Sequence, residues 1–358
     1  MKTPADLIRR EIAKRGVLPF ARFMELALYA PDCGYYETKK NNVGKRGDFY
    51  TSVSVGSLFG ELLAFQFAEW LDAEAGGRKP EAGIIEAGAH DGKLAKDILN
   101  WLQLNRPKLF GQIEYCIIEP SARRQEWQRE TLKDFSPHVR WFSRFNDSTI
   151  QRFNGIIFSN ELLDAMPVQR FGWDAKNKKW FEWGVAIAGG KFAWAKIQNP
   201  ESRIRNPELE SVLPDGYTVE ISPAAENWWR EAASVLKSGK LMTIDYGFTA
   251  DEMFSPSRTN GTLRAYSRHH ASDNILANAG EQDLTAHVNF SAIQKVGENA
   301  GLITGQFCGQ TKFLTEILAR AAKNNSFGGW DDSDTRQFQT LTHPEHLGRA
   351  FRVLVQSR

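Results

Sequence analysis

Several features that would narrow the choice of fold or function are scarce in this sequence. Of its 358 residues only three are cysteines, Cys33, Cys116 and Cys308, which lie far apart and form no CxxC pair or Cys/His cluster. Disulfide frameworks and structural zinc sites need such clusters, so we expect neither and predict no metal. A chain without paired cysteines suits a reducing compartment, and the cytoplasm is the expected location.

Long apolar runs and a strong charge of one sign are missing as well. No apolar run approaches the roughly 20 residues of a membrane-spanning helix. Residues 1–14 mix basic and acidic side chains, which indicates an amphipathic helix rather than a secretory signal. The formal net charge is +2, whereas nucleic-acid binding usually needs a concentrated basic face. We therefore expect neither membrane insertion nor nucleic acid as a partner.

What the sequence does contain is an alternation of short apolar runs with helical periods. Strands are predicted at 83–88, 113–119, 139–143, 155–160 and 241–245, and helices at 93–104, 121–132 and 222–236. Strands that alternate with helices form βαβ units with right-handed crossovers. The sequence therefore predicts an α/β fold with a mostly parallel sheet.

Two segments depart from this alternation. Residues 168–197 form a meander with a Gly-Gly pair at 189–190, which predicts an antiparallel hairpin within an insertion at 168–215. Residues 247–289 are polar and irregular, as is typical of a lid or substrate loop. A Gly- and Pro-rich break at 76–80 then separates an N-terminal helical cap, 1–79, from a domain at 80–358 that carries both insertions.

The first predicted strand ends in a loop, Glu86-Ala87-Gly88-Ala89-His90-Asp91-Gly92, before a helix. Glycines let a backbone turn sharply and approach a ligand, and ligands bind beyond the carboxyl ends of parallel strands. The loop resembles the acidic, glycine-rich loop of class I methyltransferases, which surrounds the methionine part of S-adenosyl-L-methionine. The resemblance implies that Glu86, Gly88 and Gly92 bind this cofactor, with His90 in place of the middle glycine. A plain strand–helix turn is the alternative.

The second predicted strand ends at Glu119, where a carboxylate can accept hydrogen bonds from both hydroxyls of a ribose. NAD enzymes share this feature, so Glu119 does not choose the cofactor, and it could instead be a helix N-terminal charge before Ser121. An NAD-dependent oxidoreductase would prefer GxGxxG and a Tyr/Lys or His dyad, which we do not find.

Two carboxylates follow the fourth predicted strand, at the place where methyltransferases hold the methyl acceptor. Glu161 and Asp164 are three apart, so on a helical turn they would share a face and clamp a guanidinium. A solvated acidic turn is the alternative. We expect Glu161 and Asp164 to be catalytic, with Asn160 ordering the loop and contacting the cofactor. Asp245, after the late strand, is a further catalytic candidate or only an anchor for the 247–289 loop.

Taken together, these segments resemble the MidA family, whose mitochondrial members are protein arginine methyltransferases needed for assembly of respiratory complex I. The similar segments occur in order along most of the chain: 21–29 with 34–36, 47–52 with 58–61, 160–167, 244–247, 261–265 and 283–290. The resemblance implies a class I, Rossmann-like methyltransferase with an N-terminal helical cap. It also implies S-adenosyl-L-methionine as cofactor and a protein arginine as acceptor, with a respiratory-complex subunit as a candidate partner.

The resemblance implies further that Gly47, Asp48, Phe49 and Thr51 fold over the cofactor, so that the cap acts as a lid. The family usually reads Leu-Gly-Pro-Gly-x-Gly in the cofactor loop, and the bulkier His90 is expected to narrow the pocket or shift its affinity. Two other classes remain open. One is a non-catalytic S-adenosylmethionine-binding assembly factor that grips a partner through the aromatic hairpin near Trp180. The other is a nucleic-acid methyltransferase, although the Pro-Pro-aromatic sequence typical of base methylation is missing after Asn160.

Overall fold

The computed structural model describes residues 3–38, 51–75, 82–145, 150, 152–197, 210–267, 270–324 and 326–358. Gly47, Asp48 and Phe49 therefore lie outside the described residues, as does the predicted break at 76–80. Among the residues that are described, no helix is long and apolar enough to cross a membrane.

The predicted parallel sheet is present and forms the centre of the molecule. Its strand order is β15-β16-β10-β5-β2-β3-β4, and the five strands from β10 to β4 run parallel, while β16 is antiparallel to both of its neighbours. The strands are β2 (Gly83–Ala87), β3 (Tyr115–Ile118), β4 (Val139–Phe142), β5 (Phe153–Asn160), β10 (Leu236–Phe248), β15 (Ile303–Gly309) and β16 (Phe351–Ser357), with β14 (Val288–Asn289) beside the end of β10. After β2 the chain adds β3 and β4 on one side of it, and then β5 and β10 on the other side. The strand order therefore reverses between β2 and β5.

Helices cover both faces of this sheet because its strands are apolar on both sides. Ile84 packs with one hydrophobic cluster and Ile85 with the other, as the two-residue period of a strand requires. The first cluster lies beneath α5 (Leu58–Ala75), α6 (Lys93–Asn105), α13 (Gln310–Lys323) and α14 (Asp332–Thr342), and the second beneath α10 (Pro223–Val235) and α12 (Phe290–Asn299). The other helices of this part of the molecule are α4 (Ser52–Val55), α7 (Pro107–Phe110), α8 (Ala122–Thr131) and η1 (Lys133–His138).

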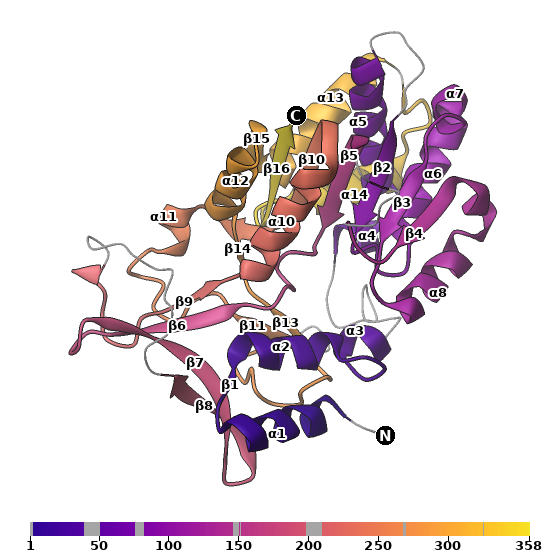
Figure 1. Cartoon of the computed structure of the whole chain (residues 1–358). Coiled ribbons are helices and arrows are strands. Elements are labelled where there is room, and N and C mark those ends of the chain that lie inside the picture. Colours follow the sequence, from indigo (N-terminus) through magenta and orange to yellow (C-terminus); the bar gives the residue numbers. More distant parts are fainter. Residues whose placement is uncertain are drawn as a thin grey trace.

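A second layer lies below the parallel sheet in Figure 1 and combines the N-terminal helices with the two insertions. It contains α1 (Pro4–Arg15), α2 (Phe20–Tyr29) and α3 (Tyr35–Thr38), and an antiparallel sheet of β1 (Leu18–Pro19), β6 (Gln169–Asp174), β7 (Lys179–Ala188), β8 (Lys191–Ile197) and β9 (Thr218–Ile221). The predicted hairpin is β7–β8, and Gly189 and Gly190 turn it with φ of 56° and 77°. The N-terminal helices divide between the two layers. Helix α5 packs against the parallel sheet, whereas α1, α2 and α3 share a hydrophobic cluster with the antiparallel layer.

The segment at 247–283, expected to be irregular, contains short regular elements between its turns. The insertion at 247–289 contains α11 (Ala250–Met253) and a small sheet of β11 (Arg264–Ser267), β12 (His270–Ser272) and β13 (Asp283–Thr285). Its strands are too short for a period to be visible in the sequence. Leu263, Ala265 and Leu284 become buried because they pack against the N-terminal helices, a contact that no local pattern encodes.

Candidate active site

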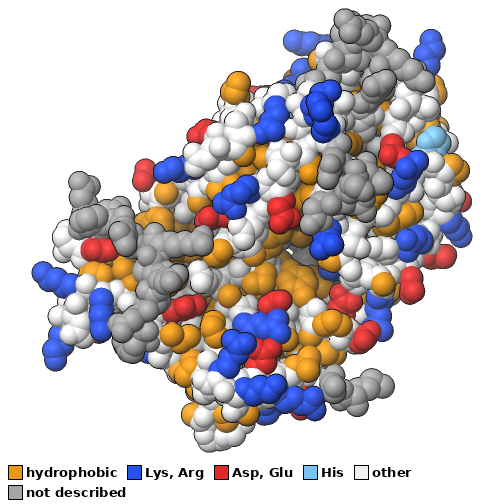
Figure 2. Space-filling model, viewed as in Figure 1, with side chains coloured by type: hydrophobic (Ala, Val, Ile, Leu, Met, Phe, Trp, Pro, Cys, Tyr) orange, Lys and Arg blue, Asp and Glu red, His pale blue; other side chains and the backbone are white. Residues whose placement is uncertain are grey.

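A cavity of about 1250 Å³ opens at the carboxyl ends of β2, β3 and β5, where the strand order reverses. This is the position at which α/β sheets bind ligands, and the volume exceeds the roughly 300–1,000 Å³ of a typical small-molecule pocket. On the face shown in Figure 2, hydrophobic side chains gather where the N-terminal layer meets the sheet, with acidic side chains beside them. The cavity therefore has room for a cofactor and for part of a second substrate.

The loop after β2 forms one wall of this cavity, and its glycines are required by geometry. Gly88 has φ 75° and Gly92, which precedes α6, has φ 85°. A Cβ at Gly88 would also lie 2.8 Å from Cδ1 of Leu162. His90 adopts φ 45°, a left-handed conformation that costs an L-residue roughly 1–2 kcal/mol.

Carboxylates stand at the ends of β2 and β3. Glu86 is 2% exposed, lines the cavity, and accepts a 2.6 Å hydrogen bond from the Tyr115 hydroxyl. Burial raises the pKa of Glu86 to about 8. Glu119 also lines the cavity and pairs with Arg124 at 2.9 Å, while the Ser121 N–H donates to it at 2.9 Å. Glu119 is thus both a cavity carboxylate and a charge at the start of α8, so the two sequence interpretations are compatible.

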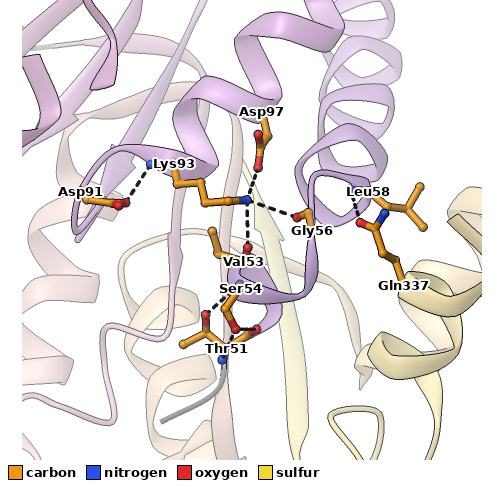
Figure 3. A network of polar contacts seen from close by, with 9 residues as sticks. All are labelled: Thr51, Val53, Ser54, Gly56, Leu58, Asp91, Lys93, Asp97 and Gln337. Atoms are coloured by element: carbon orange, nitrogen blue, oxygen red, sulfur yellow. Dashed lines mark hydrogen bonds and ion pairs between the residues drawn. The ribbon is translucent and has the colours of Figure 1, made fainter. Parts of the chain in front are cut away.

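Lys93, the first residue of α6, joins the cofactor loop to α4 (Figure 3). Its Nζ donates to the carbonyl oxygens of Val53 at 3.0 Å and Gly56 at 3.4 Å, and to Oδ2 of Asp97 at 2.9 Å. Thr51 caps α4 through reciprocal hydrogen bonds with Ser54. Thr51, Val53 and Ser54 line the cavity, so Lys93 positions a second wall of it. Sequence reasoning missed Lys93, because its partners Val53 and Gly56 in and beside α4 lie 40 and 37 positions away.

The loop after β5 is not the helical turn that we expected. Glu161 has φ 50°, and its N–H donates to the Ile244 carbonyl at 2.9 Å. Asp245 then accepts from the N–H groups of Leu162 at 3.1 Å and Leu163 at 2.8 Å, which ties the chain to β10 instead of letting it coil. Glu161 and Asp164 nevertheless both line the cavity, whereas Asp245 is not among the described residues that do. Asp245 is therefore a positioning residue for this loop.

Asn160, at the end of β5, carries an unsatisfied acceptor. Its Nδ2 donates to Oε1 of Glu161 at 3.0 Å, but its Oδ1 is buried and has no hydrogen-bond partner among the described residues. Asn160 lines the cavity, and a buried polar atom normally has a partner. A ligand with a donor group would satisfy this oxygen.

Three carboxylates in the cavity form what we call the acidic cluster, Glu161, Asp164 and Asp283. Burial, together with the nearby charge of Asp245, raises the pKa of Glu161 to about 8. Burial, together with Asp245, Asp283 and Glu161, raises the pKa of Asp164 well above its ordinary value. Carboxylates that repel one another in a buried site favour either a proton or a bound cation.

Sequence reasoning missed Asp283 and the tyrosines that share this end of the cavity, namely Tyr29, Tyr36, Tyr246 and Tyr266. All but Tyr266 occur in the segments that resemble the MidA family, which was the available signal. Within the described residues, no group of three or more His, Cys, Asp or Glu is placed to hold a metal ion.

The fold and the cavity together define a Rossmann-like protein that binds an adenosine-containing cofactor at its switch point. Gly88 follows β2 with a positive φ, Glu119 follows β3, and Asn160 at the end of β5 lines the cavity and carries an unsatisfied acceptor.

The chain belongs to the family described as "Putative S-adenosyl-L-methionine-dependent methyltransferase", whose family model matches residues 62–308. A crystal structure of a "likely methyl transferase" from Burkholderia thailandensis, bound to S-adenosyl-homocysteine, is 33% identical. It superposes with a TM-score of 0.85 and covers 99% of this chain and 92% of that one.

Two curated relatives are named for their acceptor. The mitochondrial protein arginine methyltransferase NDUFAF7 homolog of Drosophila melanogaster is 24% identical over 98% of this chain and 84% of its own length. The mitochondrial protein arginine methyltransferase NDUFAF7 of Mus musculus is 26% identical over 95% and 81%. The predictions of a class I fold, of S-adenosyl-L-methionine as cofactor, of methyltransferase activity and of the MidA family are confirmed. Neither an NAD enzyme nor a non-catalytic assembly factor is favoured.

Proposed function

We propose that this methyltransferase modifies an arginine side chain of a protein, and that Glu161 and Asp164 bind the guanidinium. The observation that carries the proposal is the acidic cluster, in which enclosed carboxylates face the same cavity as the cofactor loop. Asp164 is only 6% exposed, and burying such charges without a counter-ion is unfavourable. A guanidinium has five N–H donors in a planar fork and would satisfy both carboxylates. The names of the curated relatives support the same acceptor.

The residues of the other wall fit S-adenosyl-L-methionine. Gly88 lines the cavity and lets the loop pack closely on Leu162, and Gly92 lets the loop turn into α6. Glu86 with the unsatisfied Oδ1 of Asn160 suits the amino group of the methionine part. Glu119 suits the ribose hydroxyls, and Thr51 closes the cavity beside the loop. Gly47, Asp48 and Phe49 remain proposed contacts on the strength of the family resemblance alone.

The bound cofactor supplies a methyl group on a sulfonium. In the transfer, the methyl carbon–sulfur bond breaks with its electron pair staying on sulfur, a carbon–nitrogen bond forms, and the nitrogen loses a proton. Glu161 and Asp164 orient the attacking nitrogen and offset the positive charge of the guanidinium, and one of them accepts this proton. A carboxyl whose pKa lies near 8, as for Glu161, accepts and releases protons in the neutral range.

The test is methyl transfer from labelled cofactor to proteins extracted from cells that lack this chain, followed by mass spectrometry of the labelled residue. We expect label on arginine. Asp164→Asn should lower the rate by about 100-fold, a loss typical of a transition-state electrostatic contact, and should leave S-adenosyl-homocysteine affinity unchanged. The matched control is Asp251→Asn, which removes an exposed acid from α11. Label on another residue type only, or a wild-type rate in Asp164→Asn, would contradict the proposal.

For the partner, the MidA resemblance supports a subunit of a respiratory complex. For the location we propose the cytoplasm, which the three free cysteines support, although the curated relatives are named as mitochondrial. Both proposals are tested by fractionating cells that express the tagged chain and by identifying the arginine-methylated proteins that its deletion removes. A signal confined to another compartment, or targets outside the respiratory complexes, would reject them.

A further inference from the structure

Asp283 lies at the same end of the cavity as Glu161 and Asp164 but comes from a different layer of the molecule. It is the first residue of β13, in the second insertion, and is 2% exposed. All three carboxylates line the same cavity, and the charge of Asp283 contributes to the raised pKa of both Glu161 and Asp164. Nothing in the family assignment gives Asp283 a role.

The N-terminal layer holds Asp283 in place. The hydroxyl of Tyr36, in α3, donates to Oδ1 of Asp283 at 2.7 Å. The ring of Tyr36 stacks on Tyr29 with centroids 5.4 Å apart, and the Tyr29 hydroxyl donates to the Ala165 carbonyl at 2.8 Å. Two tyrosines of the N-terminal helices therefore connect β13 to the loop that carries Asp164.

A backbone contact makes the same connection from the other side. The N–H of Ala286, just beyond β13, donates to the carbonyl oxygen of Asp164 at 2.9 Å. Asp283 and Asp164 are thus joined both through the tyrosines and through the main chain. A buried carboxylate held beside two others is repelled by their charges. A bound cation would offset this repulsion, so the position of Asp283 suits a cation-binding site.

We propose that Asp283 is a third carboxylate of the acceptor subsite, held by Tyr36, and that it makes the subsite select arginine over lysine. The inference rests on the proposed function. A guanidinium offers donors along several edges of one plane and stacks on aromatic rings, and both Tyr29 and Tyr36 line the cavity beside Asp283. A lysine ammonium is a compact charge with three donors on one nitrogen, and it makes neither the bidentate pairs with carboxylates nor the planar stacking on rings that a guanidinium makes. Asp283 is a binding residue in this scheme, and Tyr36 is a positioning residue.

The experiment titrates the full chain, saturated with S-adenosyl-homocysteine, with acetyl-arginine amide and acetyl-lysine amide. We expect the wild-type protein to prefer the arginine probe. Asp283→Asn should weaken arginine-probe binding by about tenfold, which corresponds to about 1.4 kcal/mol, and should narrow the preference over lysine. Tyr36→Phe keeps the ring and should weaken binding by a smaller factor.

Two controls separate binding from folding. Asp251→Asn removes an exposed acid, and Tyr217→Phe removes a hydroxyl that is buried in a different hydrophobic cluster. Both should bind the probes as the wild type does, and S-adenosyl-homocysteine affinity should be the same in every variant. If Asp283→Asn does not fold, Tyr36→Phe alone is the test. A role in binding the acceptor should raise KM for the acceptor more than it lowers kcat.

The outcomes distinguish this inference from the proposed function. A wild-type protein that transfers no methyl group to arginine and shows no preference for the arginine probe would overturn both. A wild-type protein that methylates arginine, with folded Asp283→Asn and Tyr36→Phe variants that keep its probe affinity and preference, would overturn the role of Asp283 alone.

Discussion

The cofactor side and the acceptor side of the cavity are assembled in different ways. The cofactor side uses residues 86–91, 118–124 and 143–145, at or directly after the ends of β2, β3 and β4, together with α4 and the start of α6. The acceptor side collects residues from α2, α3, the 160–166 loop, β10 and the second insertion. The first is built on the ends of parallel strands and on helices packed against the same sheet, and the second needs the two layers to be docked. Cofactor binding is therefore a property of the sheet, and acceptor choice is a property of the docking.

The two sides also differ in how their charges are balanced. On the cofactor side Glu119 already has a cation, Arg124 at 2.9 Å, and Glu86 has the Tyr115 hydroxyl at 2.6 Å. On the acceptor side Asp283 has the Tyr36 hydroxyl at 2.7 Å, but the acids of the cluster also repel one another, and burial and this repulsion raise the pKa of Asp164. The acceptor side is therefore the part of the site that most needs a bound cation.

The largest expected effect comes from Asp245→Asn, which should damage the acceptor side alone. The carboxylate accepts from three backbone N–H groups, of Leu162, Leu163 and Tyr246, and an amide would turn an NH₂ group toward one of these donors. We expect kcat to fall by about 100-fold, as for a misplacement of about 1 Å. Stopped-flow or endpoint assays measure kcat, and calorimetry should find unchanged S-adenosyl-homocysteine affinity. A loss of cofactor affinity as large as the loss of kcat would break the distinction between the sides.

The pH dependence should separate activity from stability. The pKa of Glu161 lies near 8 in the folded protein and at 4.5 ordinarily, so the folded state holds a proton between these values that the unfolded state has lost. This contribution to stability is complete below pH 4.5 and is lost as the pH rises to about 8. The rate of methyl transfer should instead rise toward pH 8, since an ionised cluster binds the cation.

Denaturant unfolding between pH 5 and pH 8 measures the first trend. Glu161→Gln should make the free energy of unfolding depend less steeply on pH, whereas Asp251→Asn should leave this dependence unchanged. A slope that is as steep in Glu161→Gln as in the wild type would show that Glu161 does not titrate in this range.

Lys93→Met tests the cofactor side and should have a smaller effect. The variant loses hydrogen bonds to Val53, Gly56 and Asp97, so α4 is no longer fastened to the cofactor loop. We expect S-adenosyl-homocysteine to bind about tenfold more weakly, in line with the loss of a charge-assisted contact. Lys96→Met removes a charge from the same helix without these contacts and should bind normally. An equal loss of S-adenosyl-homocysteine affinity in both variants would mean that the positive charge of α6, and not the attachment of α4, supports cofactor binding.

The smallest effect is expected from His90→Gly. Glycine relieves the left-handed backbone at φ 45°, but it also gains freedom in the unfolded chain, so stability should change by less than about 1 kcal/mol. Because His90 lines the cavity, its removal should tighten cofactor binding by about threefold or less, the scale of a minor steric contact. Calorimetry measures this directly, and clearly weaker binding would mean that the imidazole contacts the cofactor.

Much of the cofactor side could be predicted because its information is local. The loop after β2, the acid after β3 and the order of strands all follow from short segments read one after another. The acceptor side was only half predictable. Glu161 and Asp164 stood out as a pair, but the expected helical turn is wrong, because Glu161 adopts φ 50° and the following N–H groups are tied to Asp245 of β10.

The sequence by itself determined the parallel sheet, the place of the cofactor loop and the acids that end its strands, since each depends on residues close together in the chain. Only the tertiary structure decided that Asp283 joins Asp164, that Tyr29 and Tyr36 line the same wall, and that Lys93 fastens α4. These contacts link residues far apart in the chain. Tyr36 and Asp283, for example, are separated by 247 positions. Such contacts form only when the two layers bury their apolar faces against each other, and no local period encodes that event.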